Sequence, residues 1–302
     1  MCAALALYTT IYPGVEPYLA EWHKSVRDQT DREFQLWIGL DQLKKDSVQS
    51  LLGDGIEASW VEGFPEASPA QIRQMALARI VETASEVVLV DSDDLLHPTR
   101  VAAARSALQT SDLVGCALRL VDQWGKNLDT TFSLSPQLKL EEVLPRNNVF
   151  GFSNSAFRAE LLKQCLPIPA NTALVDWFIA TRAWLFGAKL RFDGEPRMDY
   201  RQHPNNMALV RLPFSPDQVS RATALVCEHF RLVLGEPIQG GFIPDRYIEV
   251  ERVAEEVEEF SQRVVPDPVR LTNYVNAFNA MATPQIWWSC VANPALSYLW
   301  RK

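Results

Sequence analysis

The sequence predicts an α/β protein: a mostly parallel, twisted sheet with flanking helices, followed by a C-terminal helical extension. Strand and helix patterns alternate along the first third of the chain, which is typical of a parallel sheet covered on both faces. Short aliphatic runs ending in polar residues mark buried strands. From Ser215 onward, apolar residues recur only at helical spacing. The length of 302 residues is sufficient for one large α/β domain with a smaller appendage.

The first helices and strands are predicted from the spacing of apolar residues and from the prolines and glycines that interrupt it. Val15, Leu19, Trp22 and Val26 lie on one face of a helix that begins after a Pro-Gly break. Ser68 is placed to cap a helix whose first turn contains a proline. Strands are expected at residues 3–9, 33–40, 56–61 and 87–90, and helices at 15–26, 43–52, 68–83 and 98–108. Ligands bind beyond the carboxyl ends of the strands in such sheets.

The second part of the chain changes pattern. Strands are expected at 113–121, 150–157, 190–192 and 198–202, and helices from 158 to Cys165 and at 174–186, 217–234, 245–263 and 267–281. A boundary near Leu212 divides a sheet domain, residues 1–212, from a helical region, residues 213–302. The apolar tail at 285–300 predicts a buried helix or an oligomer contact, with burial favoured.

Composition excludes several classes of function. The formal charge is −8 and no run of Lys or Arg is present, which disfavours nucleic acid as a partner. The five cysteines are scattered without a CxxC pair, which is typical of a reducing compartment. Neither a basic leader nor a span of about eighteen apolar residues is found, so a cytoplasmic protein without a transmembrane segment is expected. Assembly into a homo-oligomer is a further expectation that the sequence leaves open.

An acidic cluster follows the strand at 87–90. Asp91 and Asp93 are two residues apart and point to one side if the chain stays extended. Two converging carboxylates repel each other unless a cation or a proton lies between them. Mg²⁺ held by few carboxylates completes its shell with water and phosphate oxygens. The alternative is a solvated acidic turn before the helix that begins near Pro98. Asp41 also follows a strand and belongs to the same edge of the sheet.

Several segments together resemble the family 2 glycosyltransferases, which have the GT-A fold. Residues 86–94 resemble their strand with a DxD motif, and Ile72-Arg73-Gln74-Met75-Ala76-Leu77 is similar to their Ala-Arg-Asn-x-Ala-Leu helix. Leu174-Val175-Asp176-Trp177 resembles the motif of the catalytic base, and Tyr200-Arg201-Gln202-His203-Pro204-Asn205-Asn206 resembles a Tyr-Arg-x-His-Gly-x-Asn segment. The resemblance covers about residues 3–207, and the helical region at 213–302 is then expected on the acceptor side or at an oligomer contact. Asp41 stands alone where the family usually has two acids, and Val175 replaces the first acid of the base motif.

The resemblance implies an inverting, metal-assisted transfer of a sugar from a nucleotide-diphosphate donor to a hydroxyl of a glycan or another acceptor. Asp41, Arg73, Asp91 and Ser92 are then expected at the nucleotide. Asp93, with His203 as a second ligand, is expected to hold Mn²⁺ or Mg²⁺, and a histidine ligand favours Mn²⁺. Asp176 is expected to take the proton of the acceptor hydroxyl.

Alternatives stay open for these residues and for the function. Asp176 could instead be a charged residue in the first turn of a helix, where the helix dipole stabilises it. The alternative for His203 is an ordinary histidine of a surface loop. Trp124, Trp177 and Trp184 are candidates for sugar-stacking platforms, with core packing favoured for Trp184. A sugar nucleotidyltransferase is one rival, although the Gly-rich basic loop after the first strand is missing. A catalytically silent, glycosyltransferase-like binding protein is the other.

Overall fold

The structure is a computed structural model that describes residues 4–53, 56–135, 137–203, 206, 212–235, 241–281 and 286–301. The chain forms two compact units. The first contains Met1–Ser135, Phe150–Asn171 and Ala188–Pro204, and the second contains Pro136–Val149, Thr172–Gly187 and Asn205–Lys302. The second unit therefore includes two segments from within the predicted sheet domain, 136–149 and 172–187, besides the C-terminal helices. The assignment of separate functions to residues 1–212 and 213–302 stays a prediction.

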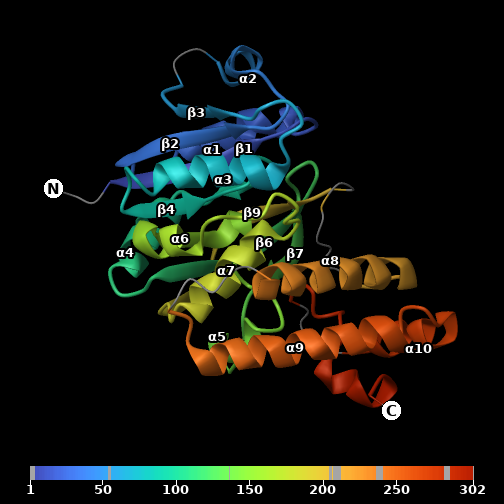
Figure 1. The fold of residues 1–302 in the computed structure, drawn as a ribbon. Helices are drawn as coiled ribbons and strands as arrows, with labels where there is room; N and C mark the ends of the chain where they lie inside the picture. The colour runs from blue at the N-terminus through green and yellow to red at the C-terminus, as the bar shows by residue number, and fades with distance from the viewer. Residues whose placement is uncertain are drawn as a thin grey trace. The chain divides into compact units, whose positions relative to one another are not determined.

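The first unit is built on a nine-stranded sheet with the strand order β3-β2-β1-β4-β8-β6-β9-β5, and β7 pairs with β6 (Figure 1). The strands are β1 (Leu5–Ile11), β2 (Phe34–Leu40), β3 (Ser59–Glu62), β4 (Glu86–Leu89), β5 (Leu95–Leu96), β6 (Leu113–Asp122), β7 (Asn127–Phe132), β8 (Ser155–Arg158) and β9 (Leu190–Gln202). β3, β2, β1 and β4 are parallel neighbours, and β6 is parallel to β9. β8 is antiparallel to β4 and β6, β7 to β6, and β5 to β9. The predicted α/β class with a GT-A-like sheet is confirmed.

Helices connect the parallel strands. The first unit contains η1 (Glu16–Tyr18), α1 (Leu19–Arg27), α2 (Lys45–Leu52), α3 (Pro69–Ile80), α4 (Arg100–Leu108), η2 (Phe152–Asn154) and α6 (Ala159–Cys165). Because such crossovers are right-handed, α1 and α2 cover one face of the sheet and α3 the other. Figure 1 shows α3 in front of β1 and β2. Ser68 caps α3, as the sequence predicts, and the structure adds a capping box in which the Gln71 side chain accepts from the Ser68 backbone N–H.

Two strand predictions differ from the structure. The predicted strand at 150–157 begins as η2, in which Asn154 N–H donates to the Gly151 carbonyl at 3.2 Å, and only Ser155–Arg158 pairs as β8. The two short strands at 190–192 and 198–202 are one strand, β9, whose pairing with β6 shifts register around Ala117. Bulges of this kind accommodate Pro196, which cannot donate to the ladder. Residue 3, the first of the predicted strand at 3–9, lies outside the described residues.

The second unit is helical. It contains α5 (Leu140–Val143), α7 (Val175–Leu185), α8 (Pro216–Gly235), α9 (Pro244–Arg263), α10 (Pro268–Asn279) and η3 (Pro294–Leu299). α8 packs against α7, α9 and α10. The aromatic core includes Phe260, whose ring lies 4.6 Å from that of Tyr274 and 6.1 Å from that of Trp300. The predicted tail helix is a turn followed by η3, with Trp287 and Trp300 buried; residue 285, the start of the predicted tail, is outside the described part.

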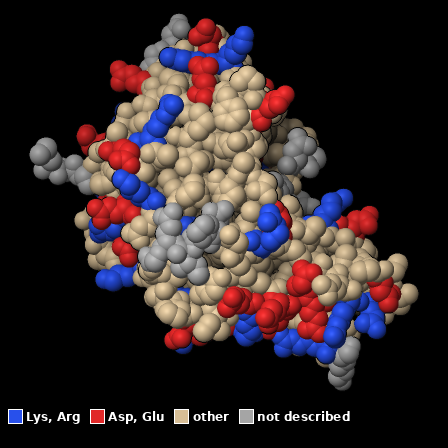
Figure 2. All heavy atoms as spheres, in the orientation of Figure 1, with Lys and Arg blue, Asp and Glu red and all other residues tan. Residues whose placement is uncertain are grey.

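Charged side chains of both signs are interspersed over the face seen in Figure 2. Along α9, arginines alternate with acids at helical spacing: Arg252 pairs with Glu249 and Glu256, and Arg263 with Glu259. Such pairs on one helix contribute only a few tenths of a kcal/mol each, about 0.3–0.5. Among the described helices, none combines the length and the apolar character that crossing a membrane requires.

Candidate functional site

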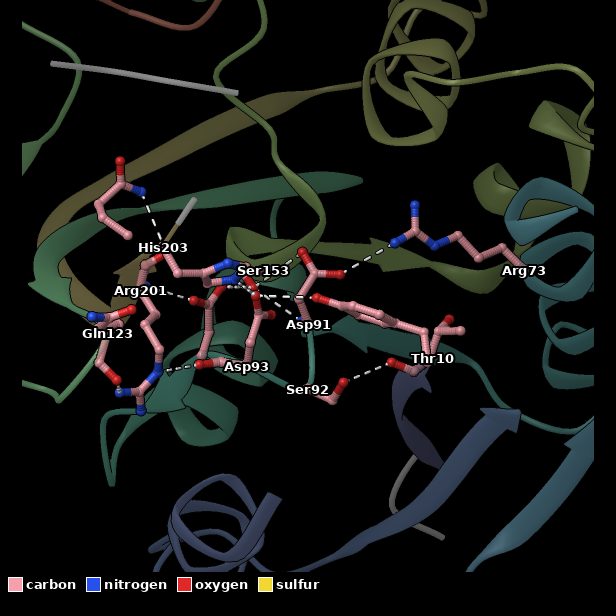
Figure 3. A network of polar contacts seen from close by, with 12 residues as sticks. Thr10, Arg73, Asp91, Ser92, Asp93, Gln123, Ser153, Arg201 and His203 are labelled. Atoms are coloured by element: carbon pink, nitrogen blue, oxygen red, sulfur yellow. Dashed lines mark hydrogen bonds and ion pairs between the residues drawn. The ribbon is translucent and has the colours of Figure 1, made fainter. Parts of the chain in front are cut away.

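The acidic turn at residues 91–94 lies where β1 and β4 end. β1 and β4 are parallel neighbours, so their carboxyl ends meet at one edge of the sheet. Ser92 is fully buried, and its hydroxyl donates to the carbonyl of Thr10 at the end of β1, at 2.8 Å (Figure 3). This hydrogen bond ties the turn to the neighbouring strand. The Ser92 hydroxyl therefore has a structural partner, and its part in nucleotide binding stays a prediction.

Asp94 is the buried anchor of the turn. Its side chain is 1% exposed, and it accepts hydrogen bonds from the Ser153 hydroxyl and from the backbone N–H of Arg201, the latter at 2.7 Å. Ser153 also accepts from the backbone N–H of Asp91 at 3.0 Å. Burial, followed by the charges of Asp93 and Asp91, raises the pKa of Asp94 well above its usual range. Asp94 thus connects β4, η2 and the end of β9.

Arg201 joins four segments of the first unit. Its guanidinium is 1% exposed and donates to the carbonyl of Asp93 at 2.8 Å, to that of Gln123 at 3.1 Å and to the carboxylate of Glu21 at 2.7 Å (Figure 3). It also lies 4.6 Å from the ring of Tyr18. A planar guanidinium with several fixed donors suits such a junction better than an ammonium does. Arg201 therefore holds the acidic turn against helix α1 and the β6–β7 turn.

Asp93 and His203 converge in the first unit. His203 Nε2 lies 2.8 Å from Asp93 Oδ2, each side chain is only 8% exposed, and the imidazole stacks on Tyr18 at 5.6 Å. The Tyr12 hydroxyl donates to the same carboxylate oxygen at 3.2 Å. Burial, followed by the charge of Asp93, raises the pKa of Tyr12, so the phenol keeps its proton and donates.

The pair of Asp93 and His203 fits a divalent cation by its chemistry. One carboxylate oxygen and one imidazole nitrogen are a suitable donor set for Mn²⁺, with phosphate oxygens and water to complete the shell. No group of three or more His, Cys, Asp or Glu side chains able to hold a metal occurs among the described residues. Among the described residues, Asp93 and His203 can therefore supply two ligands here, and the remaining ligands of a cation would come from outside the chain. Pro204 and Asn205 of the predicted histidine segment lie outside the described residues.

Arg73 and Asp41 lie on the other side of Asp91. Arg73 donates to Asp91 Oδ1 at 3.3 Å, and its guanidinium lies 4.2 Å from the ring of Phe152. Asp41 follows β2 and is 5% exposed; burial raises its pKa, while Gln42 and the charge of Arg73 lower it. Within the described part of the chain, Asp41 Oδ1 and Arg73 Nε are buried atoms with no hydrogen-bond partner. A ligand with complementary polar groups satisfies both atoms.

Asp176 belongs to the second unit, in the first turn of α7. Its carboxylate accepts from the Asn148 side-chain amide at 3.1 Å and from the backbone N–H of Trp177 at 2.8 Å. The side chain is partly exposed, and the N-terminus of a helix stabilises its negative charge. The carboxylate is therefore held in a defined orientation at the start of α7.

The structure brings six of the seven predicted site residues together in the first unit: Asp41, Arg73, Asp91, Ser92, Asp93 and His203. Their roles stay predictions. Sequence reasoning missed Tyr12, Ser153 and Asn148 as partners of the acidic side chains. No spacing could have shown them, because Tyr12 and Asp93 are 81 positions apart and Ser153 and Asp94 are 59 apart.

Solved structures share this fold. The chain is similar to the first 349 residues of TarS from S. aureus, crystallised with UDP-GlcNAc, with a TM-score of 0.56 and 14% identity over 86% of this chain and 71% of that one. It is also similar to the mannosyltransferase PcManGT from Pyrobaculum calidifontis, in complex with GDP-Man and Mn²⁺, with a TM-score of 0.55 and 16% identity over 97% of this chain and 78% of that one. No protein-family model and no curated protein sequence matches the chain. The chain thus has the fold of nucleotide-sugar glycosyltransferases, as the resemblance of its motifs implies.

Proposed function

We propose that the protein is a glycosyltransferase that transfers a sugar from a nucleotide-diphosphate donor to an acceptor hydroxyl, with metal assistance and with inversion at the anomeric carbon. The observation that carries this proposal is the convergence of Asp91, Asp93 and His203 beside the carboxyl ends of β1 and β4. The fold, shared with donor-bound glycosyltransferases, supports it. The cytoplasmic location expected from the sequence stays a prediction.

The residues of the first unit bind the donor. Asp41 accepts from the nucleotide base through its unpartnered oxygen, and Arg73 donates through its unpartnered Nε. Asp91, oriented by Arg73, accepts from the ribose or helps to hold the cation. Asp93 and His203 hold Mn²⁺ or Mg²⁺, which neutralises the charge that develops on the leaving diphosphate.

Asp176 acts as the base on the acceptor. Its Oδ2 is oriented by Asn148 and its Oδ1 by the Trp177 N–H. In the proposed reaction, the carboxylate takes the proton of the acceptor hydroxyl as that oxygen attacks the anomeric carbon. Attack on the face opposite the diphosphate inverts the configuration.

The first experiment measures release of nucleoside diphosphate from UDP-GlcNAc and GDP-mannose, with and without Mn²⁺. Asp93→Ala should abolish Mn²⁺-dependent donor binding, because it removes one of two protein ligands. Asp46→Ala, an exposed aspartate on α2, is the matched control and should bind as the unmodified protein does. Slow release from either donor identifies an enzyme, whereas donor binding without release favours the catalytically silent binding protein. Formation of nucleotide sugar from sugar phosphate and nucleoside triphosphate instead identifies a nucleotidyltransferase.

The second experiment tests the base. Asp176→Asn should bind the donor as tightly as the unmodified protein does but lower kcat at least a hundredfold, since general base catalysis contributes about 10²–10⁴. Asp217→Asn is the matched control, because Asp217 is an exposed first-turn aspartate of another helix, α8. Comparable turnover in Asp176→Asn and Asp217→Asn would refute the assignment of Asp176.

A further inference from the structure

The C-terminal segment of the second unit places a tryptophan against Trp177, the residue that follows the proposed base. The Trp288 ring lies parallel to that of Trp177, with a centroid distance of 6.4 Å and an interplanar angle of 10°. Trp177 directly follows Asp176 in α7. The preceding residue, Trp287, forms a backbone bridge with Asn148, whose side chain donates to Asp176. Asn148 and Trp177, which each donate a hydrogen bond to the Asp176 carboxylate, therefore also contact the segment that carries Trp288.

Trp288 differs from the other tryptophans of this segment in two respects. Trp287 is 4% exposed and Trp300 is fully buried, whereas Trp288 keeps part of its surface accessible. Its backbone has φ +68°, the left-handed region, which costs free energy for a bulky side chain. Backbone strain of this kind clusters at ligand-binding and active sites. The free energy gained by burying an indole does not account for the strained backbone of Trp288, because this side chain stays partly exposed.

The ring beneath Trp288 belongs to a packed aromatic cluster. Trp177 is fully buried, and its indole N–H donates to the carbonyl of Leu144 at 3.3 Å. The His229 ring stacks on Trp177 at 4.1 Å and 15°. Phe230 meets the same indole edge to face at 5.7 Å. Trp288 therefore extends a packed aromatic stack to the surface, and a preorganised platform loses little conformational freedom when a ligand binds.

We propose that Trp288 is the platform for the acceptor of the transfer reaction, and that this acceptor is a saccharide whose apolar C–H face stacks on the indole. The proposal rests on the proposed function, because it takes Asp176 as the base that receives the acceptor's proton. An indole offers a flat apolar surface with one polar edge, which matches a pyranose ring with apolar faces and polar rim. The C-terminal segment, for which the sequence predicts a buried helix or an oligomer contact, then contributes to acceptor binding.

The test compares two substitutions at one position. Trp288→Asn removes the aromatic ring but tolerates the left-handed backbone, because asparagine adopts it more readily than most residues do. Trp288→Tyr keeps an aromatic face. Tyr298→Ala is the control, since Tyr298 is 58% exposed in the same segment. Donor turnover with UDP-GlcNAc or GDP-mannose is measured with p-nitrophenyl β-D-glucopyranoside and with chitotriose as acceptors.

The proposal predicts a change in acceptor KM alone. Trp288→Asn should raise the acceptor KM about tenfold, as expected for loss of one aromatic stacking contact, and leave donor hydrolysis without acceptor unchanged. Trp288→Tyr and Tyr298→Ala should stay near the value of the unmodified protein. If Trp288→Asn leaves the acceptor KM unchanged and only lowers the melting temperature, Trp288 is a packing residue and the proposal is overturned.

A second readout needs no turnover. Saturation-transfer NMR detects binding of chitotriose and of methyl β-D-glucopyranoside to the full chain, and the signal should disappear in Trp288→Asn but persist in Trp288→Tyr. If the unmodified protein releases no nucleoside diphosphate but shows this pattern, the proposed function fails while the saccharide platform stands. If the unmodified protein hydrolyses its donor but neither saccharide binds or reacts, the donor reaction stands and the saccharide class is wrong.

Discussion

Substitution of Arg201 tests how the acidic turn is held. In Arg201→Met, the carbonyls of Asp93 and Gln123 lose a charged donor, and the buried position gains no replacement. A buried acceptor left without a donor costs about 1–3 kcal/mol. The contact with the Tyr18 ring adds about 1 kcal/mol. We expect Arg201→Met to lower the free energy of unfolding by about 3–5 kcal/mol, toward the low end of the sum of two carbonyls left without a donor and the lost ring contact.

The exposed partner of the same guanidinium provides the comparison. Glu21 is 57% exposed, so its ion pair with Arg201 contributes at most about 1 kcal/mol. Glu21→Gln should therefore shift the thermal midpoint by about 3 °C, whereas Arg201→Met should shift it by roughly 10 °C, since about 2–4 °C corresponds to 1 kcal/mol in a protein of this size. Arg201→Lys should lie between them, because an ammonium cannot reach all three acceptors.

Differential scanning calorimetry of the three variants measures these shifts, and release of nucleoside diphosphate with Mn²⁺ measures the consequence for the site. Arg201→Met should lose Mn²⁺-dependent release even at a temperature where it is folded, because Asp93 loses its anchor and His203 is two residues away along the chain. Equal midpoint shifts in Arg201→Met and Glu21→Gln would refute this account of the turn.

Three further predictions follow from buried polar groups. Burial lowers the pKa of His229 to about 3, so the unfolded chain binds more protons between that pH and about 6.5, and stability falls as the pH drops through this window. Between pH 7.5 and pH 5, the free energy of unfolding of the unmodified protein should fall by about 2 kcal/mol, and this fall should be missing in His229→Phe. Urea unfolding at both pH values measures the difference. Asp41→Asn should raise the thermal midpoint at neutral pH, because burial raises the pKa of Asp41 and makes its charge costly, yet isothermal calorimetry should show weaker nucleotide binding. Asn148→Ala should lower kcat about tenfold with little change in the donor KM, since it removes the amide that orients Asp176; a changed donor KM would contradict a role on the acceptor side.

Local sequence was sufficient to predict the elements that carry the acidic turn. Val87, Val88 and Leu89 are fully buried in β4, and four aliphatics followed by Asp91 predict a strand that ends at the site. The cap of α3 was predictable in the same way, because Ser68 and Gln71 act on backbone groups within one turn. Each of these features depends on residues that are neighbours along the chain.

Features that depend on distant partners could not be predicted. β9 appears in the sequence as two short strands because Gly194 and Pro196 interrupt the apolar pattern, and only pairing with β6 makes it continuous. Asn154 interrupts the predicted strand at 150–157, since its side chain donates to the carbonyl of Cys116 at 2.7 Å. The left-handed backbone of Trp288 is equally invisible in sequence, because propensity disfavours it for tryptophan.

The two buried acids Asp94 and Asp41, at this edge of the sheet, differ in whether their carboxylate oxygens have hydrogen-bond partners. Asp94 is 1% exposed and Asp41 is 5% exposed, so burial alone does not separate them. Asp94 accepts from the Arg201 N–H and the Ser153 hydroxyl on different oxygens, which matches a carboxyl that holds the fold together. Asp41 Oδ1 has no such partner within the described residues, and an unsatisfied buried acceptor costs about 1–3 kcal/mol. That cost is recovered when a ligand from outside the chain donates to Asp41. Substitution of Asp41 should therefore weaken ligand binding more than it destabilises the fold. Substitution of Asp94 should destabilise the fold more than it weakens ligand binding.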